Sequence, residues 1–155
     1  MRGSTVPGVV AALAILHLAL VLPNHPAALR PETLLFLPLE APAIVAILVL
    51  VGPAGAVSKA ARAVLTVAIL LISLLKLGDY GTAVAYSRPF TAAVDHHLIA
   101  AGWNLTRGSV GPATTALLAA LTAVVLVLAA LGLWGALGRL AALGPPRRGM
   151  RAPLA

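Results

Sequence analysis

Four apolar runs, separated by short polar segments, dominate the 155-residue chain; they cover residues 6–22, 33–52, 60–77 and 112–135. Each approaches the roughly 17–25 apolar residues that a helix needs to cross the hydrocarbon core of a bilayer. The pattern therefore predicts an all-α integral membrane protein, a bundle of four transmembrane helices. Pro112 suits the first turn of the last helix.

The first run follows Arg2, as the apolar part of a secretory signal peptide would. It is long for such a segment, however, and no clean small-x-small cleavage site precedes the loop "PNHPAALRP". We expect a retained helix. The first two connections are short, so consecutive helices should pack antiparallel.

The distribution of Lys and Arg predicts the orientation, because cytoplasmic loops carry an excess of both. With a cytoplasmic N-terminus, the inner side holds seven of them: Arg2, Lys59, Arg62, Arg139, Arg147, Arg148 and Arg151. The outer side holds four: Arg30, Lys76, Arg88 and Arg107. Both termini are thus expected in the cytoplasm, with residues 136–155 as a basic tail or linker containing "GPPRRGMR".

Composition supports a membrane protein, since 61% of the residues are hydrophobic and 10% are charged, against about 25% charged in soluble domains. The richness in alanine and leucine favours a bacterial source, and hence the bacterial inner membrane. The net charge of +7 does not indicate nucleic acid, because the cations lie at the ends of apolar runs without a basic stripe. The lack of cysteine excludes disulfides and thiolate sites.

Glu40 is the most unusual residue, a carboxyl group about 10 Å inside the second run at 1.5 Å per residue. Pro38 and Pro42 flank it and should kink or open the helix. Three further polar residues fall in the same outer half of the predicted bundle: His17, Lys76 and Asp79. We expect the four to form a polar cluster that locks the helices together.

Intramembrane carboxyl groups are candidate functional sites by default. In one interpretation, Glu40 and His17 form a proton relay or substrate site. In the other, Glu40 is protonated or paired with Lys76 and only stabilises the bundle. The second is favoured, because a single carboxyl group without further polar lining makes a poor pathway.

The outer loop, residues 78–111, carries the densest chemistry. Phe90, Val94, Leu98 and Ala101 recur at helical spacing, which predicts a short amphipathic helix lying along the interface. Ser87 or Arg88 before Pro89 suits its start, and Gly102 its end. Aromatic residues of the interfacial belt, Tyr86 and Trp103, flank it.

No catalytic or metal motif occurs in the chain. Asp95, His96 and His97 are adjacent, so the two imidazoles diverge by about 100° on a helix, and the spacing of H-E-x-x-H is absent. His25 is the other nearby ligand type. Asn104 begins a glycosylation sequon, which matters only in a eukaryotic secretory route. We expect no metal and no cofactor.

Three segments together resemble the membrane region of a known family: "LVLPNHP" at 20–26, "LLKLGDYGT" at 74–82, and the loop from "RPF" at 88–90 to "GSVG" at 108–111. The resemblance is to bacterial sulfatase-like membrane proteins of the alkaline-phosphatase superfamily, relatives of the phosphoglycerol transferases. Their chemistry belongs to a large domain that follows the helices and carries a metal-activated hydroxyl nucleophile. None of its motifs occurs here, so no catalytic residue carries over.

By this resemblance, the family's loop residues are Arg88, Pro89, Phe90, Asp95, His97, Gly102, Trp103 and Ser109. They would shape the outer surface beneath a catalytic domain. The leading interpretation is therefore a non-catalytic membrane-anchor module, whose partners are the lipid bilayer and an extracytoplasmic catalytic domain. A free-standing subunit of a larger membrane complex is the alternative, and a transporter or proton-conducting protein using Glu40 has less support.

Overall fold

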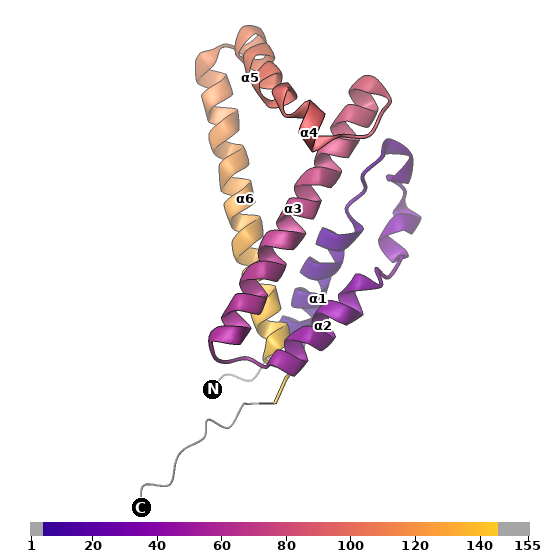
Figure 1. Ribbon diagram of the computed structural model, residues 1–155, viewed down its shortest axis with the longest axis vertical. Coiled ribbons are helices and arrows are strands. Elements are labelled where there is room, and N and C mark those ends of the chain that lie inside the picture. Colours follow the sequence, from indigo (N-terminus) through magenta and orange to yellow (C-terminus); the bar gives the residue numbers. More distant parts are fainter. Residues whose placement is uncertain (1–4, 146–155) are drawn as a thin grey trace, which may run out of the picture.

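The computed structural model describes residues 5–145, which contain helices and no strand. The order along the chain is α1 (Val6–Val21), η1 (Pro26–Ala28), η2 (Pro31–Leu35), α2 (Glu40–Val51), α3 (Ala56–Tyr86), α4 (Ala92–Asp95), α5 (His97–Val110) and α6 (Pro112–Ala141) (Figure 1). The expected all-α class is confirmed. Half of the predicted tail, residues 146–155, and Arg2 lie outside the described residues.

Three stretches are long and apolar enough to cross a membrane: Pro31–Val51, Ala56–Tyr86 and Pro112–Ala141. α1 is apolar but has 16 residues, about 24 Å at 1.5 Å per residue, against a hydrocarbon core of about 30 Å. The helix expected over 6–22 is present, and three membrane-spanning candidates are established by length and composition.

The second apolar run is not one continuous helix. η2 gives way to a non-helical stretch, and α2 begins only at Glu40. Proline supplies the reason, because Pro38 cannot donate a backbone hydrogen bond and Pro42 fits only the first turn of a helix. The opening expected at these prolines is confirmed.

The third and fourth helices exceed their predicted bounds. α3 begins four residues early and continues to Tyr86 instead of ending at Leu77. α6 continues past Gly135 to Ala141, so residues 136–141 belong to the bundle and not to a tail. Ala136, Leu137, Leu140 and Ala141 are in fact among its most buried residues.

Burial is concentrated at one end of the bundle. The core joins α1, α2, α3 and the C-terminal part of α6 through these residues: Ala12, Leu16, Ile44, Leu48, Ile69, Leu133, Ala136, Leu137, Leu140 and Ala141. We call this the basic end, because Lys59, Arg62 and Arg139 lie there. Towards the opposite end, the connector end, α6 diverges from α3 (Figure 1).

Helices α4 and α5 bridge that divergence. From the start of α6, α5 runs back towards α3, where α4 lies (Figure 1). The expected helix boundaries here were wrong. The single helix expected here is two helices: the N-cap of α4 is Thr91 instead of Ser87 or Arg88, and α5 passes through Gly102 to end before Gly111. Gly111 has φ +84°, a conformation that glycine adopts without steric cost.

Candidate functional site

The connector between α3 and α4 starts at a strained residue. Ser87 has φ 55° and is the one non-glycine residue with positive φ among residues 5–145. Its N–H donates to the carbonyl oxygen of Ala83 over 3.1 Å, which closes the last turn of α3. Such a left-handed cap is normally glycine, and non-glycine residues in sparsely populated conformations cluster at functional sites.

A bidentate ion pair organises the connector. Arg88 Nη1 and Nη2 donate to Asp95 Oδ2 and Oδ1 over 2.8 and 2.5 Å, and the Thr91 N–H donates to Oδ2 over 2.8 Å. Asp95 is completely buried. These hydrogen bonds, first from Arg88 and then from Thr91, hold the pKa of Asp95 well below its usual range. The same pair raises the pKa of Arg88.

A second carboxylate fixes the connector to α3. The Phe90 N–H donates to Asp79 Oδ1 over 2.9 Å. The Phe90 ring packs against Gly78, where an added Cβ would lie 3.1 Å from two ring atoms. Arg88, Phe90 and Thr91 are thus held in place by two acidic side chains.

Beside these contacts lies a small pocket, which we call the connector pocket. Its volume is about 160 Å³, and its lining is Asn24, His25, Asp79, Ala83, Ser87, Arg88 and Pro89. The three segments that carry the family resemblance all contribute to it. His25 Nδ1 accepts a hydrogen bond from the Ala27 N–H over 3.1 Å, so the neutral ring carries its proton on Nε2.

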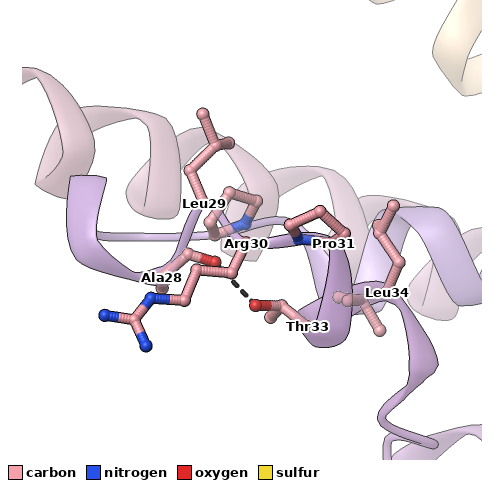
Figure 2. Close-up of a pocket in the computed structure, with 8 residues that line it drawn as sticks. Ala28, Leu29, Arg30, Pro31, Thr33 and Leu34 are labelled. Atoms are coloured by element: carbon pink, nitrogen blue, oxygen red, sulfur yellow. Dashed lines mark hydrogen bonds between the residues drawn. The ribbon is translucent and has the colours of Figure 1, made fainter.

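A larger hollow of about 310 Å³ lies within the first connection, between α1 and α2. Its lining is Val21, Pro23, Ala28, Leu29, Arg30, Pro31, Thr33 and Leu34. Figure 2 shows Thr33 bonded to the Ala28 carbonyl, a contact of 2.8 Å, and the Arg30 guanidinium extending away from Leu34. The walls are mostly aliphatic, so they provide packing surface and no group for acid–base chemistry.

The four residues of the predicted polar cluster each occupy a separate environment. His17 Nε2 contacts the Leu34 carbonyl oxygen at 2.8 Å, which ties α1 to η2. Lys76 Nζ donates to the Leu20 carbonyl oxygen over 2.5 Å, which caps the C-terminus of α1. Asp79 holds Phe90, and Glu40 is exposed at the first turn of α2. No ion pair joins these four within residues 5–145.

The predicted loop residues divide between the connector and α5. Arg88 and Pro89 line the connector pocket, while Asp95 and Phe90 hold the connector. The other four residues lie on α5, outside the pocket: His97, Gly102, Trp103 and Ser109. His97 Nδ1 contacts the Val94 carbonyl at 2.7 Å, and Ser109 Oγ donates to the Leu105 carbonyl over 2.8 Å.

Sequence reasoning missed Asn24 and Ser87 as pocket residues. It also missed a contact at the basic end, where Arg62 lies over the ring of Trp134 with Cζ 4.1 Å from the centroid. An arginine early in one apolar helix and a tryptophan late in another were a usable signal. No feature of the amino-acid sequence predicts the left-handed conformation of Ser87.

No group of three His, Cys, Asp or Glu side chains that could hold a metal gathers within residues 5–145. No family model, curated protein or solved structure matches the chain. The resemblance to sulfatase-like proteins therefore rests on the three quoted segments alone.

Proposed function

We propose that the protein is a non-catalytic membrane-anchor module of the bacterial inner membrane, and that its connector end forms the seat of an extracytoplasmic catalytic domain. The observation that carries this proposal is the use of the connector's charged groups. Arg88 donates to Asp95, and the two carboxylates, Asp95 and Asp79, accept hydrogen bonds from backbone N–H groups of the connector. A surface held in this way is suited to docking.

The proposed topology has four spans, with the basic end in the cytoplasm. The first span is α1, and its 16 residues can be accommodated by local thinning of the bilayer. The start of α1 and the end of α6 lie side by side, since an added Cβ at Gly8 would be 3.8 Å from Arg139 Cδ. Lys59, Arg62 and Arg139 at this end agree with the positive-inside rule.

In this proposal α5 lies at the outer interface. Leu98, Ala101 and Leu105 line a groove against α3, with a volume of about 490 Å³. Trp103 lies outside this groove and is 46% exposed. Such a two-sided helix with an exposed tryptophan suits the boundary between acyl chains and headgroups.

Cysteine accessibility tests the topology, because the chain has no native cysteine. Asn104→Cys on α5 should react with a membrane-impermeant maleimide in intact cells, whereas Pro53→Cys between α2 and α3 should react only after permeabilisation. Both sites are exposed, so they form a matched pair. Labelling of Pro53→Cys from outside would overturn the orientation.

Sequencing the source DNA past the codon for Ala155 tests the anchor proposal. An open frame with a fifth apolar span and a large domain is the expected result. A stop codon, with an intact mass near 15.6 kDa, would instead favour the alternative of a small subunit, which predicts stable co-purification with a larger membrane complex. A transporter would show flux across vesicles that depends on Glu40.

A further inference from the structure

The basic end carries cations that have no acidic partner within residues 5–145. All four acidic residues lie on other parts of the chain: Glu32 on η2, Glu40 at the start of α2, Asp79 late in α3 and Asp95 on α4. The ion pair found within residues 5–145 is that of Arg88 and Asp95. Lys59, Arg62 and Arg139 therefore have no acidic partner among residues 5–145.

Arg62 is held in a fixed orientation across α6. Its Nη2 donates to the Trp134 carbonyl oxygen over 2.8 Å, and the guanidinium stacks on the Trp134 ring. Gly138 makes this possible, because an added Cβ there would lie 2.7 Å from Nη2. A guanidinium has five N–H donors in a planar fork, and one of them is used in this contact.

The surrounding polar atoms also lack acceptors. Arg62 Nε, Ser58 Oγ and Thr66 Oγ1 are buried without a hydrogen-bond partner among residues 5–145. Ser58 and Thr66 lie one turn on either side of Arg62 on α3, and are 1% and 7% exposed. Buried polar groups normally have a hydrogen-bond partner. These three atoms on one face of α3 therefore lack an acceptor among the described residues.

We propose that the α3–α6 interface at the basic end binds the phosphate group of an anionic phospholipid. Guanidinium groups match phosphate oxygens in a bidentate geometry that a stacked, oriented arginine already holds. Arg62 is six residues into α3, about 9 Å along the helix, beside a tryptophan of the kind that marks the headgroup level. Lys59, exposed three residues earlier, adds a second cation. The proposal rests on the proposed membrane insertion.

Trp134 provides the reporter for a test. In a Trp103→Phe background it is the sole tryptophan. The full chain is studied in detergent micelles, and quenching of the Trp134 fluorescence by brominated phosphatidylglycerol is compared with quenching by brominated phosphatidylcholine. Each basic residue near a charged lipid surface contributes about fivefold in affinity. We expect the anionic lipid to be preferred by at least about fivefold on this scale. The preference should be lost in Arg62→Met and reduced in Arg62→Lys, which keeps the charge but loses the fork.

Two further variants keep the test decisive. Lys59 is exposed, so Lys59→Met does not disturb the core. This variant should lower the preference for the anionic lipid even if Arg62→Met fails to fold. Arg107→Met on α5 is the matched control and should leave the preference unchanged. An unchanged preference in both Arg62→Met and Lys59→Met overturns the proposal.

The source of the phosphate is tested separately. Inorganic phosphate at millimolar concentration should not displace the brominated lipid. If it does so without a preference for the anionic lipid, the site binds free phosphate and the lipid assignment is wrong. Cysteine labelling reports the topology independently, so failure of the lipid site and failure of the proposed orientation are distinguishable.

Discussion

Asp95 anchors the connector because three hydrogen bonds converge on its carboxylate. Its carboxylate accepts two bonds from Arg88 and one from the Thr91 N–H. Since the side chain is completely buried, loss of its charge would leave these donors poorly satisfied. The position of Arg88, which lines the connector pocket, therefore depends on the ionisation of Asp95.

This dependence predicts an acid-sensitive connector. The folded-state pKa of Asp95 is depressed, so its contribution is fully present above the ordinary carboxyl pKa of about 3.9 and is lost as the pH falls towards the depressed value. Hydrogen exchange at the Thr91 N–H, which donates to Asp95, should stay slow from neutral pH to about pH 4 after correction for intrinsic rates, and should accelerate as the pH falls further. In Asp95→Asn exchange should be severalfold faster at neutral pH and nearly independent of pH. An unchanged rate at neutral pH in that variant would contradict the assigned role.

At the scale of elements, two glycines one turn apart on α3 should respond differently to the same substitution. Nothing lies within 4 Å of an added Cβ at Gly81, whereas the Phe90 ring meets one at Gly78. Alanine is favoured over glycine in a helix by about 0.8–1 kcal/mol. Gly81→Ala should therefore stabilise the protein by up to about 1 kcal/mol, while Gly78→Ala should lose that gain and loosen the connector. Unfolding in mixed micelles with increasing SDS measures both, and equal effects would show that Phe90 does not pack on α3 as described.

Glu40 begins α2 on an exposed face within an apolar segment, and no ion pair involves it within residues 5–145. Placing such a group in a bilayer costs a few kcal/mol. Glu40→Leu should therefore keep the fold and stabilise it in lipid vesicles by about 1–3 kcal/mol. Glu40→Gln is the closer isostere, and it should leave vesicle proton flux at the wild-type level. Destabilisation by Leu, or flux lost on substitution by Gln, would instead assign Glu40 a working role.

The pattern of apolar residues predicts the order of the helices but not their lengths, since α3 and α6 are longer than predicted and α2, with 12 residues, is shorter. α3 continues past Leu77 through Gly78, Asp79 and Gly81. These residues are not apolar enough to extend the predicted run, but they are compatible with the helix in its tertiary contacts. In contrast, the break before α2 was predictable, because proline acts locally. The site divides in the same way. Arg88 and Asp95 could be chosen from the sequence, but their pairing needs the left-handed turn at Ser87.

Taken as a whole, the molecule is tightly packed at the basic end and open at the connector end. On α6, residues 116–129 are all exposed, while Leu133 and the buried residues after it contact three other helices. Arg62, Gly138 and Trp134 lie within this packed half. A packed basic end and an open connector end suit the proposed anchor, in which the connector end would receive another domain.

This asymmetry predicts that the same substitution on α6 has different costs at its two ends. Leu137 is completely buried and Leu121 is 53% exposed. Lipid tails are as apolar as leucine, so the cost of Leu→Ala in a membrane comes mainly from lost packing. Leu137→Ala should cost about 1–3 kcal/mol, and Leu121→Ala less than about 0.5 kcal/mol, by unfolding in mixed micelles with SDS.

The comparison is informative because both variants remove the same atoms from the same helix. A large cost at Leu121 in lipid nanodiscs that vanishes in micelles would mean that the open half of α6 packs against another protein surface in the bilayer. That result would favour the small-subunit alternative, whose contacts are made through the helices. A low cost in both media leaves the connector end as the surface available for docking, as the anchor proposal requires.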